Sequence, residues 1–381
     1  MKRTATVLLA LAALALAAPC GVRAAEKKIC AFDRAFIPFS FVRNQQPTGF
    51  EVEILEAALK GSGLGLEFKP MRSWEQGQAE LASGVVHIAP GITRTDLRDK
   101  LFIYPSTPTV ELGLKFFVNR ASLVRSVDQL RGQTVATRRD SVTQGLLQAF
   151  GGVKVRLYDD DEKAILAVQA GDAQAYLGAD KLAWDIIARR DLRNLVVVGP
   201  AMHREQLYFA LYKGETGLRD LVDRGLKRIM ADGEYDRIYR KWFVPEPSTQ
   251  DMADLAAKAA AELPTAYAPR TGTPRAAAVL TRSGEVYAAA SVEGPREGIG
   301  VTALEGAVAR AVGAGDLELR MAVVVDAQGR ALPPSGPERD LLAGFGRGVL
   351  VVLEPNPGER EAWMVQALLP FAQSAPVRPE D

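Results

Sequence analysis

The sequence HIAPGITRTDLR (residues 87–98) completes a regular alternation of short apolar segments with amphipathic ones. The strand-like segments are Ile29–Phe32, Leu64–Lys69 and the first four residues of this stretch, and the helical ones are Glu51–Gly61 and Gln76–Ser83. Strands that alternate with helices favour an α/β sheet with helical crossovers. The stretch therefore predicts the fold class of the first part of the chain.

The second half of the stretch, GITRTDLR (Gly91–Arg98), combines a hydroxyl group with a planar guanidinium. Thr93 can donate its hydroxyl, and Arg98 presents a fork of donors that matches a carboxylate bidentately, as a lysine could not. The alternative is a helix start in which Thr95 is the N-cap and Arg98 forms a surface ion pair of little energetic value. The residue types alone leave both interpretations open, and the first predicts a carboxylate pocket suited to an amino acid.

A second alternation follows further along the chain and predicts a second lobe of the same kind. Its members are the strand-like Thr134–Thr137 and Val153–Leu157 and the helical Ser141–Phe150 and Asp161–Ala170. The β-rich segments Leu112–Asn119 and Gln206–Tyr212 flank this group. We expect them to be the two strands that pass between the lobes and allow hinge closure.

The first residues have the layout of a signal peptide. Lys2 and Arg3 precede the apolar run Val7–Ala18, which is too short to span a bilayer, and the small residues that end at Ala24 offer a cleavage site. We therefore expect residues 1–24 to be removed and the protein to be periplasmic. The alternative is lipidation of Cys20, although the preceding proline fits a lipobox poorly.

Composition excludes several classes of protein. The 47 lysines and arginines nearly balance the 46 acidic residues, so no nucleic-acid partner is expected. After cleavage Cys30 would be the single cysteine, and His87 and His203 are the two histidines. We therefore expect no disulfide framework, no metal site and no cofactor. The length of 381 residues allows two or three domains.

Five motifs in order resemble the periplasmic amino-acid-binding proteins of ABC importers, the solute-binding family 3 that includes glutamine- and glutamate-binding proteins. The motifs are FDRAFIPFSF (32–41), GFEVEIL (49–55), GITRTDLR (91–98), LRGQTVATRRDS (130–141) and DGEYDRIYRKWF (232–243). The resemblance implies the two-lobed type II periplasmic-binding-protein fold over residues 25–244. Lobe 1 would comprise about 25–113 and 210–244, and lobe 2 about 114–209.

The resemblance also implies roles for residues of the first lobe. Phe36 and Trp74 would face each other across the ligand's side chain as rigid apolar walls. Gly91, Thr93 and Arg98 would take the α-carboxylate. For the two aromatic residues the alternative is an ordinary place in the core.

In the second lobe, Ser141 and the backbone amides at the start of its helix would close over the same carboxylate. Asp140 departs from the family pattern, which usually has glycine there, and this puts the close approach of the backbone in question. Asp180 would pair with the α-ammonium group, or else be a surface aspartate. Asp33 and Arg138 match positions that contact the ligand's side chain, and a cation at Arg138 would favour a polar or acidic one.

After a linker at residues 245–250, residues 251–375 resemble the cytidine deaminase fold, and residues 376–381 form a tail. The matching stretches are YAP (267–269), the strand AAAVLTRSGEVYAAASVEG (276–294), AVVVDAQG (322–329), PSGPERDLLAGF (334–345) and LLPFA (368–372). The alignment puts Thr302, Ser335 and Glu338 at the three zinc-cysteine positions and Leu304 at the catalytic glutamate. Zinc-dependent deamination needs those groups, so the resemblance implies an inactive domain.

Two further residues of this domain lie at or next to positions of a deaminase site. Glu305 is one residue from the lost glutamate, which on a helix turns its side chain by about 100° away from the site. Glu293 keeps the position of an acidic ribose contact, but Ser291 replaces the usual asparagine. We expect a structural or interaction role for the domain, with a homodimer as one possibility.

Three functions follow from these patterns. The leading one is capture of a small carboxylate-bearing ligand, most simply a polar amino acid, for an ABC permease or a sensor. The second is a dehydratase of cyclohexadienyl acids on the same fold, in which Arg98 holds a substrate carboxylate and an acid protonates the leaving hydroxyl. The third is an accessory protein of a periplasmic dehydrogenase.

Overall fold

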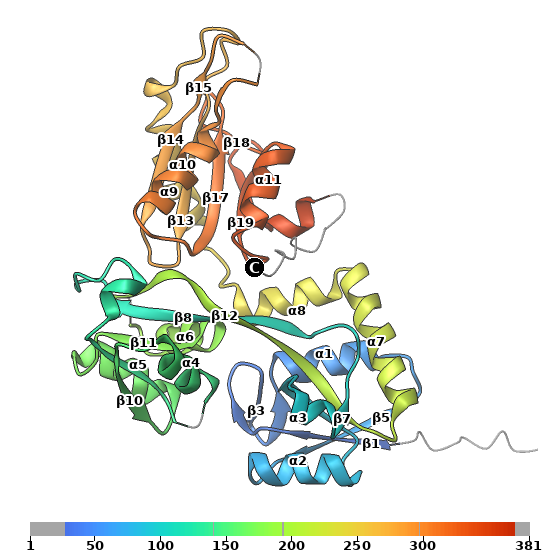
Figure 1. The fold of residues 1–381 in the computed structure, drawn as a ribbon. Coiled ribbons are helices and arrows are strands. Elements are labelled where there is room, and N and C mark those ends of the chain that lie inside the picture. Colours follow the sequence, from blue (N-terminus) through green and yellow to red (C-terminus); the bar gives the residue numbers. More distant parts are fainter. Residues whose placement is uncertain (1–26, 140, 193, 297, 370–381) are drawn as a thin grey trace, which may run out of the picture.

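The computed structural model describes residues 27–139, 141–192, 194–296 and 298–369 (Figure 1). The predicted signal peptide with Cys20, the residue Asp140 and the tail at 376–381 lie outside the described residues. The described chain forms two lobes that share a nine-stranded sheet and a C-terminal domain with a sheet of its own. Within the described ranges, no helix is long and apolar enough to cross a membrane.

Lobe 1 is a parallel sheet with helices on both faces. Leu55 and the other apolar residues of α1 pack on one face together with α7 and α8, whereas Leu81 of α2 packs on the other. The strands are β1 (Lys27–Phe32), β5 (Gly65–Pro70), β6 (Ile88–Thr93) and β7 (Phe102–Ile103), with a small sheet of β2 (Ala35–Phe36), β3 (Ser40–Arg43) and β4 (Gln46–Thr48). The helices are α1 (Phe50–Leu59), α2 (Trp74–Ser83), α3 (Asp96–Asp99), α7 (Thr216–Ala231) and α8 (Glu234–Phe243).

Lobe 2 repeats this layered arrangement. Leu147 of α4 packs on one face of its strands, and Ile165 of α5 and Ile186 of α6 pack on the other. Its strands are β9 (Thr134–Arg138), β10 (Lys154–Tyr158) and β11 (Ala175–Ala179), and its helices are η1 (Val127–Leu130), α4 (Val142–Phe150), α5 (Asp161–Ala170) and α6 (Asp180–Arg189). The predicted elements of both lobes are present, with ends that differ by a few residues.

Two long antiparallel strands, β8 (Val110–Asn119) and β12 (Leu195–Tyr212), run from one lobe into the other. On the side of lobe 2, β8 pairs with β11, and on the side of lobe 1, β12 pairs with β6. Their register shifts between Val198 and His203 of β12. These are the hinge strands expected from the sequence.

The C-terminal domain contains a six-stranded sheet, in which five strands follow the order β14-β13-β17-β19-β20 and β18 pairs with β17. Leu304 of α10 and Leu342 of α11 pack on one face, and Leu255 of α9 packs on the other. The helices are α9 (Thr249–Ala260), η2 (Leu263–Thr265), α10 (Ala303–Gly313), α11 (Gly336–Ala343) and η3 (Val365–Leu368). The strands are β13 (Ala276–Thr281), β14 (Val286–Ala290), β15 (Val292–Glu293), β16 (Gly300–Val301), β17 (Leu319–Val325), β18 (Ala331–Leu332), β19 (Leu350–Asn356) and β20 (Glu359–Met364).

The expectation of one strand over residues 276–294 was wrong. The segment folds back on itself as the hairpin β13–β14, because Gly284 adopts a φ of 87° in the turn between them. A side chain would be strained in that conformation, so the glycine marks the turn.

One apolar core joins lobe 1 to the C-terminal domain. It contains Leu226 of α7 and Phe243 of α8 together with Leu255 of α9 and Val323 of β17. The apolar clusters of lobe 2 are separate from it. Lobe 1 and the C-terminal domain therefore share their packing, while lobe 2 has its own.

Candidate functional site

Thr93 and Arg98 lie side by side where β6 ends. The Arg98 Nη1 donates to Thr93 Oγ1 at 2.7 Å and to the Thr93 carbonyl at 3.1 Å. Thr95 is the N-cap of α3 and accepts from the backbone amide of Arg98 at 3.2 Å. The ion pair at this turn is formed by Arg94 with Asp99, at 2.9 Å. The Arg98 side chain is thus half-buried and is oriented by Thr93, which accepts from Nη1 alone and leaves the other guanidinium nitrogens for a ligand.

Phe36 and Trp74 lie near opposite ends of the stretch Gly91–Arg98: Phe36 near Gly91 and Trp74 near Arg98. Gly91 has a φ of 71°, and a Cβ at this position would lie 3.3 Å from the ring of Phe36. The ring of Trp74 lies 5.8 Å from the Arg98 guanidinium. Phe36 also stacks on Phe39, with 4.6 Å between ring centroids. Lobe 1 therefore brings Phe36, Gly91, Thr93, Arg98 and Trp74 together.

Asp33 and Arg138 both have partners within their own lobes. The Asp33 Oδ1 accepts from the amide of Ala35 at 2.9 Å. The Arg138 Nη1 lies 3.5 Å from Asp161 Oδ2, and Tyr176 donates its hydroxyl to Asp161 at 2.7 Å. Burial raises the pKa of Asp161, and the Arg138 guanidinium opposes that rise. Arg138 is the last residue of β9 and is exposed.

Ser141 is the N-cap of α4. Its hydroxyl accepts from the amide of Gln144 at 3.3 Å and donates to the Arg138 carbonyl at 2.6 Å. The preceding Asp140 lies outside the described residues. The N-terminus of α4 and Arg138 therefore adjoin in lobe 2, where both favour a negative charge.

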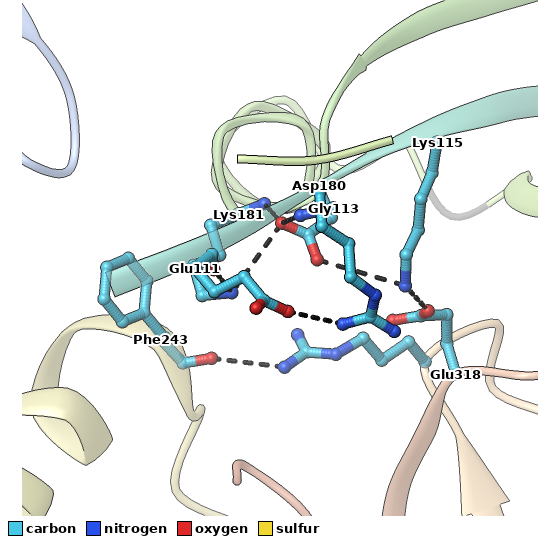
Figure 2. Close-up of polar contacts among 9 residues, drawn as sticks. Glu111, Gly113, Lys115, Asp180, Lys181, Phe243 and Glu318 are labelled. Atoms are coloured by element: carbon cyan, nitrogen blue, oxygen red, sulfur yellow. Dashed lines mark hydrogen bonds and ion pairs between the residues drawn. The ribbon is translucent and has the colours of Figure 1, made fainter. Parts of the chain in front are cut away.

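Asp180 is engaged at the hinge. Its Oδ1 accepts from the amides of Gly113 at 3.2 Å and Lys181 at 2.7 Å, and its Oδ2 lies 3.9 Å from Lys115 Nζ (Figure 2). Gly113 and Lys115 belong to the hinge strand β8. The carboxylate is thus held by backbone and by a cation of the protein itself.

The sequence patterns missed Glu205, an acidic residue of the hinge strand β12. Leu207 of β12 pairs with Thr93 of β6. Glu205 lies two residues before Leu207 and projects from the same face of β12 as Leu207, because side chains alternate along a strand. Burial raises the pKa of this half-buried carboxyl, while His203 and Arg98 oppose the rise. Glu205 is thus a carboxyl group within electrostatic reach of Arg98, and we call Thr93 and Arg98 together the clamp. The available signal was an acidic residue immediately before the predicted strand Gln206–Tyr212.

A second carboxyl, Glu51, is fully buried behind Gly91. Its Oε1 accepts from Thr109 Oγ1 at 2.6 Å, and the amide of Gly91 donates to the same carboxyl group. The Thr109 hydroxyl also lies 3.0 Å from the carbonyl of Leu207, so its single proton serves one of these two oxygens at a time. Burial raises the pKa of Glu51 to about 8. The network ties α1 to the residue before β8, to Leu207 in the last third of β12 and to the backbone of Gly91.

The residues aligned with a deaminase site serve the local fold. Thr302 and Glu305 form the capping box of α10, and Ser335 and Glu338 form that of α11. Leu304 is fully buried in the core. Within the described residues, no group of three or more histidine, cysteine and acidic side chains is placed to hold a metal ion.

Glu293 is also engaged. Its Oε2 accepts from the amides of Arg270 and Thr271 at 2.9 and 3.1 Å, and its carboxylate receives the Thr271 hydroxyl. These contacts hold the loop before β13 and lower the pKa of Glu293. The position that resembles a ribose contact is therefore occupied by the protein's own loop.

Comparison with known proteins identifies relatives for both parts of the chain. Residues 29–245 match the family model of bacterial extracellular solute-binding proteins, family 3, and residues 259–354 match the cytidine deaminase-like model. The L-cystine-binding protein of Escherichia coli K12 is 30% identical over 211 residues, which cover 54% of this chain and 78% of that protein. The L-glutamate/L-aspartate-binding protein of Pseudomonas aeruginosa is 24% identical over 224 residues, which cover 55% of this chain and 74% of that protein.

Solved structures agree with this assignment of the fold. An ancestral cationic amino-acid solute-binding protein has a TM-score of 0.51 and 28% identity, and the match covers 57% of this chain and 95% of that one. A histidine kinase sensor domain similar to periplasmic binding proteins has a TM-score of 0.50 and 26% identity, with 57% and 96% covered. The chain belongs to family 3 of the bacterial extracellular solute-binding proteins and carries a cytidine deaminase-like domain at its C-terminal side.

Proposed function

We propose that this protein captures a free amino acid between its two lobes and presents it to an ABC permease or a sensor in the periplasm. The observation that carries the proposal is the orientation of Arg98 by its two hydrogen bonds to Thr93. Glu205 adds an acidic group whose pKa burial raises and the Arg98 charge lowers. An amino acid carries a carboxylate and an ammonium group a few bonds apart. A cation and an anion at one end of a cleft match that pattern.

The roles of the residues follow from their chemistry. Arg98 and Thr93 would take the α-carboxylate, and Glu205 would take the α-ammonium group, since Asp180 already has partners at the hinge. Phe36 and Trp74 would flank the ligand's side chain. Closure would then bring Arg138 and the N-terminus of α4 from lobe 2 toward the ligand. A ligand favours closure only by its higher affinity for the closed form.

Binding to Arg98→Ala tests the proposal against a close control. A thermal-shift screen of amino acids identifies the ligand, and calorimetry then compares Arg98→Ala with Arg94→Ala, whose exposed guanidinium pairs with Asp99. We expect Arg98→Ala to weaken binding by about 2–5 kcal/mol, because it leaves a desolvated carboxylate without its partner. Arg94→Ala should bind as the wild type does. Equal affinities for all three proteins, or no amino acid that binds, would overturn the proposal.

The same cleft carboxyl favours one second function, that of a dehydratase. In that reaction Glu205 would donate a proton to the leaving hydroxyl, while Arg98 holds the substrate's carboxylate; burial raises the pKa of Glu205, the direction that a general acid needs. Prephenate and arogenate are the substrates to test. Turnover that Glu205→Gln abolishes would favour this function over capture, whereas binding of an amino acid without turnover would favour capture.

We further propose that the C-terminal domain is catalytically inactive. The support is that Thr302, Ser335 and Glu338 are committed to helix caps and that Leu304 is buried. Incubation of the protein with cytidine and a metal analysis of the purified chain test this. Deamination, or a stoichiometric zinc ion, would contradict it. The homodimer expected from the resemblance remains a prediction for light scattering.

A further inference from the structure

The C-terminal domain is attached to lobe 1 by apolar packing. The shared core runs from α8 into β13, β17 and β19 of the domain. The Cβ position of Gly348 lies 3.1 Å from the side chain of Val244, which directly follows α8. Two polar contacts reinforce this packing: Arg347 Nε lies 3.2 Å from Asp236 Oδ1, and Arg282 Nη2 donates to the Phe243 carbonyl at 3.3 Å. Lobe 1 and the domain should therefore move as one body.

The same domain contacts lobe 2 through charges. Lys115 of β8 pairs with Glu318, and both side chains are largely buried, with 15% exposure each. Further along β8, Arg120 pairs with Glu285 and donates to the carbonyl of Ser283. Figure 2 shows Lys115 extending from the hinge strand to Glu318. The contact to lobe 2 is made mainly by charged side chains, including Arg282 at 5.8 Å from the Trp184 ring, whereas the contact to lobe 1 is mainly apolar.

The charged contact reaches the hinge itself. Lys115 lies between Glu318 and Asp180, 3.9 Å from the latter, and Asp180 accepts from the amide of Gly113 in β8 (Figure 2). In the same cluster, Arg204 of β12 pairs with Glu111 of β8 at 2.5 Å. A domain fixed to lobe 1 thus holds the stretch of β8 that must rotate when lobe 2 moves.

The clamp side of the cleft lacks such a link. Among the described residues, no hydrogen bond, ion pair or ring contact joins Thr93 or Arg98 to Arg138 or Ser141. The bonds of these residues stay within their own lobes. Figure 1 shows the C-terminal domain on one side of β8 and β12 and α3 and α4 on the other. Rotation of lobe 2 toward the clamp would therefore draw Arg120 and Lys115 away from the domain.

We propose that the deaminase-like domain is a closure restraint, which holds lobe 2 apart from lobe 1 through Glu285 and Glu318. Contacts that are present with the lobes apart and lost on closure lower the fraction of closed protein and so weaken ligand binding. The effect on ligand affinity rests on the amino-acid-binding function proposed above, but the effect on the distance between the lobes does not.

The experiment compares the wild type with Glu285→Lys and with Glu318→Gln, which both change residues outside the ligand cleft. Spin labels at the exposed helix positions Glu75 in lobe 1 and Gln148 in lobe 2 report the distance between the lobes by electron paramagnetic resonance. We expect both variants to shift the distance distribution toward shorter values without ligand. With the amino acid found in the screen, we expect affinity to rise about two- to tenfold, as expected for losing one or two ion pairs of this kind.

Two controls separate the restraint from general effects. Arg120→Glu combined with Glu285→Lys restores the pair with reversed charges, so it should return the distances to those of the wild type. Glu359→Lys makes the same change of charge on an exposed part of the domain and should have no effect. Unchanged distances in both test variants, or weaker binding than in the wild type, would overturn the restraint. A protein that binds no amino acid but shows the distance shift would refute the proposed ligand and leave the restraint standing.

Discussion

Glu51 is a carboxyl group whose protonation depends on the fold. It is fully buried, one of its oxygens has no hydrogen-bond partner, and burial raises its pKa to about 8. Between its ordinary value near 4.5 and about 8, the folded protein holds a proton there that the unfolded chain has released. Stability from this group is therefore fully present below pH 4.5 and is lost as the pH rises toward 8.

Glu51→Gln should remove that dependence, because glutamine keeps an acceptor for Thr109 and cannot ionise. We expect the free energy of unfolding of the variant to exceed that of the wild type increasingly between pH 5 and pH 8, by at most about 1.4 kcal/mol per pH unit. Urea titrations across this range measure it. Glu53→Gln, on the same helix but partly exposed, controls for the loss of a carboxylate. Parallel curves for Glu51→Gln and the wild type would contradict the prediction.

Glu205 gives a second prediction at this scale. If the Glu205 carboxylate binds the ammonium group, Glu205→Gln should weaken binding of the amino acid by about 1–3 kcal/mol, since a charged hydrogen bond becomes a neutral one. The analogue that lacks the amino group should be affected much less. Calorimetry with both ligands on the wild type and the variant gives the comparison. An equal loss for both ligands would show that Glu205 acts through the fold.

At the scale of elements, α7 contains two glycines in different surroundings. A Cβ on Gly225 would lie 2.0 Å from the carbonyl oxygen of Ala58 in α1, whereas a Cβ on Gly217 would meet nothing within 4 Å. Gly225 therefore sets the close approach of α7 to α1. Gly217 has no such role.

Alanine at the two positions should have opposite effects. Gly225→Ala should destabilise the protein by about 1–3 kcal/mol, because the helices must separate. Gly217→Ala should be neutral or stabilise by up to about 1 kcal/mol, since alanine is the better helix former. Thermal unfolding of both variants, with binding as a check of the fold, measures the difference. A stable Gly225→Ala protein would show that the two helices can adjust without loss.

Comparison of the predicted elements with the observed ones shows which features of the fold could be predicted from the sequence. The alternation of strands and helices predicted both lobes, since each strand and helix carries its own apolar period. It failed for residues 276–294, where Gly284 turns an apparently continuous strand into a hairpin. The clamp stretch was recognisable because Thr93 and Arg98 are five residues apart and meet locally. Glu205 was not, because it comes near this stretch only through the pairing of Leu207 with Thr93, two residues more than 100 positions apart in the chain.

At the scale of the whole molecule, the division of the apolar clusters predicts that the protein unfolds in two separate transitions. Lobe 1 and the C-terminal domain share one apolar cluster, whereas lobe 2 has separate clusters. Cooperative units follow shared packing, so calorimetry should show one transition for lobe 2 and another for the remaining chain. Hydrogen exchange should assign protection in β9–β11 to the first unit. Separate melting of the C-terminal domain would contradict the shared core.

The shared core has a consequence for truncated genes. Tyr239 and Val244 at the end of the binding domain pack against the Gly348 position of the C-terminal domain. A premature stop codon after Pro245 would leave this apolar face bare in water, where such faces lead to aggregation. We expect the shortened product to be insoluble or degraded, so that a nonsense mutation that removes the C-terminal domain would abolish the binding protein as well as its appendage.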